Sequence, residues 1–233
     1  MSHRFLFYAP ALERDHTRVD LADEEHHHLA RVLRLRAADE IHVTNGRGLL
    51  AAATLERVTR ARSEAAITRL LADQGAPRRF ALALALIGRD RFAQAFEQCV
   101  ELGITECVPL VTAGCRRGRA ESAFHQRLER VAVAAMKQAF RCHRPVVQPV
   151  ADVRALCARI GAFERAVVGD PGGGAPAACA GDTLVIVGPE GGLTPDELAA
   201  LEGAGAARAA VSRHRLRAET AAVALVAALA HAD

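Results

Sequence analysis

From residue 80 onward, short apolar runs alternate with segments of helical periodicity. The runs expected to be strands are residues 80–87, 107–112, 146–150, 165–169, 183–188 and 209–212. A helical pattern follows nearly every one of them. Strands and helices that alternate in this way form a parallel sheet with helices on both faces. We therefore predict an α/β domain whose ligands bind at the carboxyl ends of its strands.

The first 72 residues have a different pattern, with several short runs typical of strands. These runs are residues 3–9, 18–22, 40–44, 49–58 and 65–70. The segment Asn45-Gly46-Arg47-Gly48 predicts a tight hairpin between two of them, because asparagine and glycine tolerate the positive φ of such turns. A helix is expected between the second and third runs, with Leu29, Val32 and Leu33 on one face. This part of the sequence predicts a small β-barrel with one helix.

The segment Asp73–Arg79 separates these two patterns. It is polar and contains a glycine and a proline, which is typical of a linker. We therefore predict two domains, residues 1–72 and 73–233. An apolar fraction of 51% is ample for a packed core in a chain of 233 residues.

The sequence gives no indication of a membrane segment or of secretion. The longest apolar run, Ala218–Ala230, is interrupted by Glu219 and is shorter than the roughly 20 residues that span a bilayer. The first ten residues lack the long apolar stretch of a signal peptide. The six cysteines include no C-x-x-C pair, which favours free thiols in a reducing compartment. We expect a cytoplasmic protein that is not bound to a membrane.

Three consecutive histidines, His26–His28, invite a metal hypothesis. Successive residues of a helix point about 100° apart, so all three cannot reach one ion. We predict no metal site.

The stretch LVIVGPEGGLTPDE, residues 184–197, is predicted to be a buried strand, a glycine turn and a helix capped by Thr194. A turn of this kind usually binds phosphate through backbone N–H groups and the helix N-terminus. Here no Lys-Ser or Lys-Thr follows, and the charged residue of the turn, Glu190, would repel phosphate. Neither Gly172–Gly174 nor Gly203–Gly205 has the context of a dinucleotide fingerprint. The turn at Gly188–Gly192 is therefore expected to hold a different ligand.

Basic residues gather in two regions. Arg31 and Arg34 share one face of the predicted helix, and Arg47 lies at the hairpin tip. This region is either an ordinary solvated helix face or a surface for RNA phosphates. Residues 116–144 carry a net charge of +6, compared with +3 for the whole chain, which favours a polyanionic partner. Few aromatic residues accompany them, so we expect recognition through the nucleic-acid backbone and shape.

Two C-terminal motifs carry a resemblance to a known family. GPEGGLTPDEL, followed about twenty residues later by V-S-R-H-R-L-R-A-E-T-A-A, resembles the signature of the RsmE-type SPOUT methyltransferases. The segments Glu101-Leu102-Gly103-Ile104 and HHHLARVLRLRAADEIHVTNGRG are similar to two further motifs of that family. The resemblance covers nearly the whole chain.

The resemblance implies a fold and an activity. The fold would be a PUA-like β-barrel followed by a SPOUT α/β domain whose chain forms a trefoil knot at about residues 184–220. The turn and the knot loop would enclose S-adenosylmethionine, a cationic ligand compatible with Glu190. The activity would be methylation of N3 of a uridine in the 16S RNA of the small ribosomal subunit. A homodimer is also implied, with the C-terminal helix at its twofold interface.

The resemblance and the predicted strand ends assign three sets of residues. Cofactor contacts are expected from Val168, Gly169, Gly188, Glu190, Gly191, Gly192, Val211, Leu216, Arg217, Ala218 and Thr220. The predicted catalytic residues are Arg217 and Arg91 at the uracil, with Glu219 orienting an arginine or the pocket. RNA contacts are expected from Arg31, Arg34, Arg36, Arg47, Arg89, Arg116 and Arg141.

Three residues depart from the family pattern. Ala93 replaces a family acid, Lys137 replaces another acid, and Phe140 replaces a glycine. These changes leave two alternatives open. The chain could be an RNA-binding or ribosome-assembly factor with altered catalysis, or a knotted methyltransferase with another RNA target.

Overall fold

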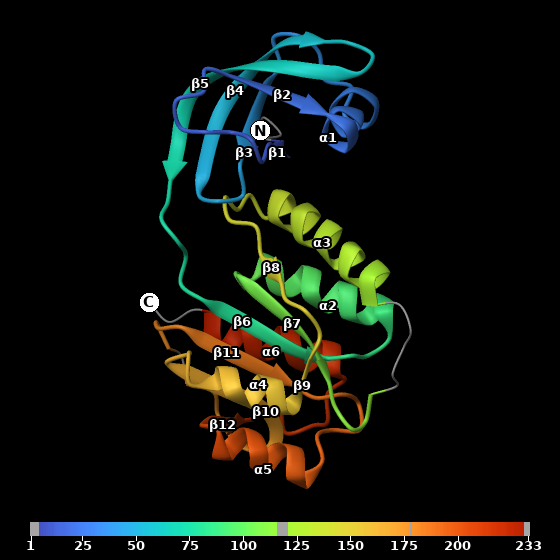
Figure 1. The fold of residues 1–233 in the computed structure, drawn as a ribbon, viewed down its shortest axis with the longest axis vertical. Helices are drawn as coiled ribbons and strands as arrows, with labels where there is room; N and C mark the ends of the chain where they lie inside the picture. The colour runs from blue at the N-terminus through green and yellow to red at the C-terminus, as the bar shows by residue number, and fades with distance from the viewer. Residues whose placement is uncertain (1–4, 116–120, 178, 231–233) are drawn as a thin grey trace. The chain divides into compact units, whose positions relative to one another are not determined.

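The computed structural model describes residues 5–115, 121–177 and 179–230. The chain forms two compact units. Figure 1 shows the fold, coloured from the N-terminus to the C-terminus. Unit 1 comprises residues 1–77 and 136–144, and unit 2 comprises residues 78–135 and 145–233. The sequence predicted a boundary between residues 72 and 73. In the structure, residues 136–144 also belong to the first unit.

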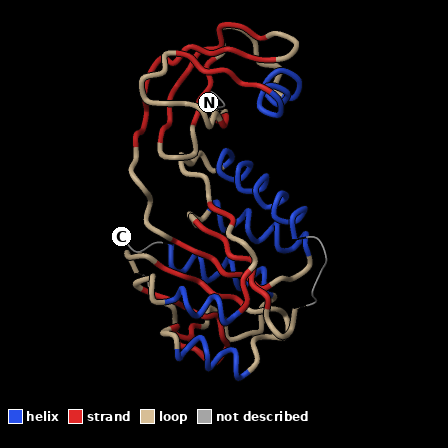
Figure 2. Tube along the Cα trace, in the orientation of Figure 1, coloured by secondary structure: helices blue, strands red, loops and turns tan. Residues whose placement is uncertain are grey.

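Unit 1 contains a five-stranded sheet in the order β1-β3-β4-β5-β2. Its strands are β1 (Leu6–Tyr8), β2 (Arg18–Ala22), β3 (Glu40–Thr44), β4 (Leu49–Val58) and β5 (Arg62–Asp73). β1 pairs in parallel with β3, and the other neighbours are antiparallel. The described strands thus form a curled sheet with β1 and β2 at its edges, a half-barrel that agrees with the strand-rich first domain expected from the sequence (Figure 2).

The hairpin between β3 and β4 forms where the sequence predicts it. Gly46 and Gly48 have φ values of +69° and +110°, which residues other than glycine rarely adopt. The Asn45 Oδ1 atom accepts hydrogen bonds from the N–H groups of Arg47 (2.8 Å) and Leu49 (3.2 Å). These contacts fix the register in which β4 alternates buried and half-buried residues along its first half.

The predicted helix of unit 1 is short and changes its winding. It consists of α1 (Asp23–His27) and the π-helical segment η1 (His28–Val32). Leu29 is fully buried, as predicted, but Val32 is 59% exposed. The prediction for Val32 was wrong because a π-helix has more residues per turn, which rotates later side chains away from the face that an α-helix would present.

Residues 136–144 contact the rest of unit 1 at several points, two of which involve residues that depart from the family pattern. The Lys137 ammonium forms an ion pair with Glu25, whose second oxygen accepts a hydrogen bond from the Tyr8 N–H at 3.2 Å. Phe140 has a φ of +57°, and its ring lies edge-on against His42, with centroids 5.1 Å apart. Two of the departures from the family pattern therefore have structural roles in unit 1.

Unit 2 contains a parallel seven-stranded sheet in the order β12-β10-β11-β6-β7-β8, with β9 paired to β7. The strands are β6 (Phe80–Ala85), β7 (Glu106–Val111), β8 (Val146–Val147), β9 (Ala151–Asp152), β10 (Arg165–Gly174), β11 (Thr183–Val187) and β12 (Ala206–Ala209). The helices are α2 (Arg89–Glu101), α3 (Glu121–Gln138), α4 (Val153–Ile160), α5 (Pro195–Gly203) and α6 (Ala218–Ala230). The prediction of a parallel α/β domain is confirmed.

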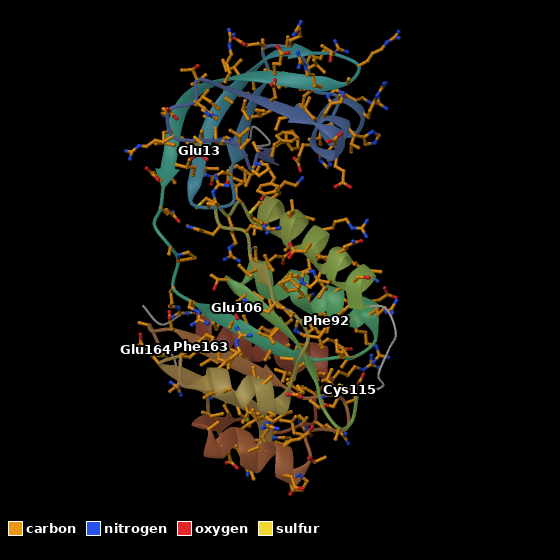
Figure 3. The ribbon with its side chains drawn as sticks, viewed as in Figure 1. Glu13, Phe92, Glu106, Cys115, Phe163 and Glu164 are labelled. Carbon is orange, nitrogen blue, oxygen red and sulfur yellow. The ribbon has the colours of Figure 1, made fainter. Side chains whose placement is uncertain are left out.

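The sheet of unit 2 has a hydrophobic core on each face. Residues of α2, α3 and α6 pack on one face, and residues of α4 and α5 pack on the other. β6 shows how the sequence specifies this arrangement, because Leu82 and Leu84 belong to the first core and Ala81 and Ala83 to the second. Phe92 of α2 is fully buried in the first core (Figure 3).

Three predicted strands of unit 2 differ from the structure by three or more residues at one end. The run 146–150 contains only the two residues of β8, and β9 follows it. β10 extends beyond the predicted residue 169 to Gly174, because the backbone at Gly173 lies against β12, where an added Cβ would be 2.5 Å from the Ala209 N atom. β12 ends at Ala209, so the predicted strand 209–212 is mostly loop.

No helix in the described part of the chain is both long and apolar enough to cross a membrane. The knot expected at residues 184–220 stays a prediction, since strand pairing does not define how a chain is threaded.

Candidate functional site

A cavity of about 480 Å³ lies at the carboxyl ends of β10, β11 and β12. These strands are adjacent and parallel, so their ends meet at one edge of the sheet. The cavity is lined by Gly169, Asp170, Pro171, Val187, Gly188, Pro189, Glu190, Gly191, Gly192, Leu193, Ala209, Ala210, Val211, Ser212, His214, Arg215, Leu216, Ala218, Ala221 and Leu225. The ligand position predicted from the parallel sheet thus coincides with this cavity.

The glycines of the turn after β11 are under different local constraints. At Gly188 an added Cβ would lie 3.0 Å from the Leu193 Cγ, and Gly192 has a φ of +80°. At Gly191 an added Cβ would have no heavy atom within 4 Å, and the backbone is not in the left-handed region. The protein itself therefore does not exclude a side chain at Gly191, although this residue lines the cavity.

The turn leads directly into α5, which begins as the sequence predicts. The Thr194 Oγ1 accepts a hydrogen bond from the Glu197 N–H at 3.2 Å, and the Glu197 carboxylate accepts one from the Thr194 N–H at 2.9 Å. This reciprocal capping box fixes the end of the turn.

Helix α6 closes another side of the cavity through Ala218, Ala221 and Leu225. β10 and α6 approach closely at Gly169, where an added Cβ would lie 2.7 Å from the Leu225 Cδ1. A side chain at Gly169 would therefore displace the Leu225 methyl group from its place in the core.

Arginines surround Glu190 at the turn. The Arg91 Nη1 donates to the Glu190 Oε1 at 2.8 Å, and the Arg215 guanidinium donates to the Glu190 backbone carbonyl. Both arginines come from segments far from Glu190 in the sequence. Glu190 therefore connects the N-terminal end of α2 and the loop before α6 to the cavity wall.

Glu219 lies in the first turn of α6 beside Arg217. The Arg217 Nη1 is 3.9 Å from the Glu219 Oε1, and the Arg217 side chain is 74% exposed. The Glu219 Oε2 is buried and has no hydrogen-bond partner in the described part of the chain. The pair is thus a weak ion pair that leaves the guanidinium accessible.

The structure brings together most of the predicted cofactor residues. Those that line the cavity are Gly169, Gly188, Glu190, Gly191, Gly192, Val211, Leu216 and Ala218. Val168 is fully buried in the core, while Arg217 and Thr220 are exposed and outside the lining. Asp170, His214 and Arg215 also line the cavity. They were not among the individually predicted cofactor residues, although the sequence placed Asp170 at a predicted strand end and His214 and Arg215 within the predicted binding segment 211–220.

The predicted RNA contacts fall into different environments. Arg31, Arg34 and Arg36 are exposed on and after η1, and Arg89 is exposed at the start of α2. Arg116 lies outside the described residues.

Arg47 and Arg141 are less available than their positions in the sequence suggested. Arg47 donates to the Pro10 carbonyl at 2.9 Å and forms an ion pair with Glu13 at 2.8 Å. Arg141 is half-buried, and this burial lowers the pKa of its guanidinium.

His26 is hydrogen-bonded within unit 1, and the cysteines are free thiols. The buried His26 ring contacts the Ser63 Oγ (2.9 Å) and the Arg60 carbonyl (3.2 Å). Among the described residues, no group of three or more His, Cys, Asp or Glu side chains could hold a metal ion. The six cysteines are free, and burial raises the pKa of Cys99 to about 12, so this thiol stays protonated.

A cavity at the carboxyl edge of a parallel sheet, lined by Glu190 and Arg215, is the arrangement typical of α/β enzymes. Residues 74–230 match the family model described as RNA methyltransferase domain, and residues 21–67 match the one described as RNA methyltransferase PUA domain. The chain therefore belongs to the RNA methyltransferase family.

Three similar proteins align with this chain over nearly the whole length of both. The ribosomal RNA small subunit methyltransferase E of Rickettsia conorii is 25% identical over 225 residues, which cover 91% of this chain and 89% of that protein. The structure of the ribosomal RNA small subunit methyltransferase E from Neisseria gonorrhoeae, bound to S-adenosyl methionine, has a TM-score of 0.85 and 26% identity, covering 97% of this chain and 96% of that one. A probable rRNA-methyltransferase from Porphyromonas gingivalis has a TM-score of 0.79 and 30% identity, covering 96% and 95%.

Proposed function

We propose that this protein uses S-adenosylmethionine to methylate N3 of a uridine in the RNA of the small ribosomal subunit. The observation that carries the proposal is the cavity built by the glycine turn, β10 and α6. The relatives named small subunit methyltransferase E, and the similar structure bound to S-adenosyl methionine, support it. Action on ribosomal RNA would place the enzyme in the cytoplasm.

The residues of the cavity fit this cofactor. A volume of about 480 Å³ lies within the usual range of ligand pockets, roughly 300–1,000 Å³. Val187, Leu216 and Leu225 offer apolar surface to an adenine ring. Asp170 and Glu190 offer carboxylates to the sulfonium and ammonium groups. When bound, S-adenosylmethionine would supply an electrophilic methyl group.

The predicted catalytic residues suit the chemistry of a uracil. The proton on N3 must be lost as the nitrogen attacks, and negative charge then develops on the flanking carbonyl oxygens. Arg91, which pairs with the cavity residue Glu190, and the exposed Arg217 would each donate to such an oxygen. Fixed donors of this kind stabilise developing charge most in a water-poor site. Glu219 would orient Arg217 across their 3.9 Å contact.

The departures from the family pattern do not favour a protein without catalysis. Ala93 is 5% exposed within the core of unit 2, Lys137 pairs with Glu25, and Phe140 packs on His42. None of these three side chains lines the cavity. We therefore propose that Ala93 adapts the packing within unit 2 and that Lys137 and Phe140 adapt the packing within unit 1.

Methyl transfer to ribosomal RNA is the direct test. We expect small subunits from a strain lacking the gene to accept a radiolabelled methyl group from S-adenosylmethionine when the purified protein is added. Methylation of N3 blocks base pairing, so reverse transcription should stop at one uridine. RNA binding without methyl transfer would instead identify an assembly factor, and a methyl group on another atom would identify a different target.

We also propose that Arg31 and Arg34 form part of the RNA surface. We expect the double change Arg31→Ala and Arg34→Ala to weaken RNA binding and to reduce the slope of log affinity against log salt by about 1.5, since each lost phosphate contact removes about 0.7–0.9. Filter binding at several salt concentrations measures this slope.

The matched control removes the same charge from another part of unit 1. Arg57 and Arg62 both pair with Glu64, at 2.6 Å and 3.2 Å, and are already engaged within the protein. Their replacement by alanine should leave the slope nearly unchanged. Equal slopes for both double variants would mean that Arg31 and Arg34 are ordinary solvated surface.

A further inference from the structure

The carboxylate of Glu197 connects two segments that are distant in the sequence. Its Oε2 accepts the hydrogen bond from the Thr194 N–H within the capping box of α5. Its Oε1 accepts a second hydrogen bond from the Ala113 N–H at 2.6 Å, across 84 residues. A helix cap needs only the first of these bonds.

Ala113 belongs to the loop Thr112–Cys115, which follows β7 (Figure 3). The loop has a defined turn, since the Cys115 N–H donates to the Thr112 carbonyl at 3.0 Å and the two side chains lie 3.3 Å apart. At Gly114 an added Cβ would lie 3.2 Å from the Pro189 Cγ and 3.9 Å from the Gly192 carbonyl oxygen. The loop backbone therefore abuts the glycine turn.

Pro189 and Gly192 line the cavity, whereas Gly114 does not. The glycine turn thus lies between the cavity and the Thr112–Cys115 loop. Glycine-rich backbone is intrinsically mobile, because glycine loses more conformational freedom on folding than other residues. A contact that holds the loop against the turn restricts the wall of the cavity to one position.

We propose that Glu197 is a positioning residue that fixes the glycine turn for its ligand by tying the Thr112–Cys115 loop to the start of α5. The identity of that ligand as S-adenosylmethionine rests on the proposed function. Glu197 does not line the cavity, so it acts through Pro189 and Gly192. Ala113 is exposed, and water can replace its bond to Glu197, so the tie affects the position of the turn more than the stability of the fold.

The decisive variant is Glu197→Gln, which keeps the size of the side chain but has a single acceptor oxygen for two N–H donors. We expect the dissociation constant and the KM for S-adenosylmethionine to rise about tenfold, with kcat within twofold of the wild type. A merely structural defect would reduce the fraction of folded enzyme, which lowers kcat and leaves KM unchanged. Calorimetry and steady-state kinetics separate these outcomes.

Two controls isolate the tie from the helix cap. Asp196→Asn removes the same charge from the same helical turn and should leave KM unchanged. Thr194→Ala removes the Oγ1 cap but leaves both acceptors of Glu197 in place, and should raise KM less than Glu197→Gln does. An equal or larger rise for Thr194→Ala would overturn the proposal, because capping alone would then explain the effect.

Hydrogen exchange in the ligand-free protein tests the tie without the cofactor. We expect the amides of Gly191 and Gly192 to exchange faster in Glu197→Gln than in the wild type or in Asp196→Asn. Unchanged exchange would refute the role of Glu197, whatever the ligand is. Faster exchange together with no binding of S-adenosylmethionine to the wild type would support the tie and refute the proposed function.

Discussion

Replacing Gly191 with valine should abolish the binding of S-adenosylmethionine while leaving the protein folded. The backbone at Gly191 is not in the left-handed region, and an added Cβ meets no protein atom within 4 Å, so the fold accommodates the side chain. Because Gly191 lines the cavity, the branched side chain would occupy space that the ligand needs. We expect a loss of at least about a hundredfold in affinity, or roughly 3 kcal/mol. Calorimetry measures the affinity, and thermal unfolding checks the fold.

Gly161→Val is the matched control. Gly161 also has no heavy atom within 4 Å of an added Cβ, and its φ of −64° suits a residue with a side chain. It does not line the cavity. This variant should bind S-adenosylmethionine as the wild type does. Unchanged affinity in Gly191→Val would remove the glycine turn from the cofactor site.

A charge in the middle of α6 should unfold unit 2. Val226 is fully buried in the core that α6 shares with α2 and the sheet, as is Leu229. An ionised Glu at position 226 would have no partner there, and burying such a group costs several kcal/mol. We expect Val226→Glu to lose about 4 kcal/mol or more, which is a large part of the roughly 5–15 kcal/mol that stabilises a typical protein. Urea unfolding measures this loss.

The same helix permits a separate test of the proposed homodimer. Ala228 is exposed and does not belong to the core in which Leu225, Val226 and Leu229 are buried. Ala228→Glu should leave the urea midpoint nearly unchanged. If α6 lies at a twofold interface, light scattering at micromolar concentration should show a dimer for the wild type and a monomer for Ala228→Glu. A fully active wild-type monomer would contradict the proposed dimer.

Local signals in the sequence predicted most of the elements. Asn45 and the glycines after it predicted the β3–β4 hairpin, and Thr194 predicted the start of α5, because each acts on backbone within a few residues. Alternating Leu and Ala in β6 reflects the two faces of one strand. The glycine turn was located correctly at the cavity for the same reason, since a strand end and a helix cap bracket it.

The contacts that escaped prediction are between residues far apart in the chain. Arg91 and Glu190 are 99 positions apart, and Lys137 and Glu25 are 112 apart. Nothing near any of these residues indicates its partner. Arg47 was predicted to contact RNA from the hairpin tip, whereas the structure places Glu13 beside it. Pairing of this kind depends on the fold as a whole, which local pattern does not specify.

Because residues 136–144 belong to unit 1, there is a consequence for recombination of the gene. The chain passes between the two units at residues 77/78, 135/136 and 144/145, so unit 1 is not encoded by one uninterrupted stretch of the gene. A recombination event that exchanged only the first 77 codons would separate Glu25 from Lys137 and His42 from Phe140. Shuffling of this half-barrel as an independent cassette would therefore be selected against, and the two units are expected to have diverged together.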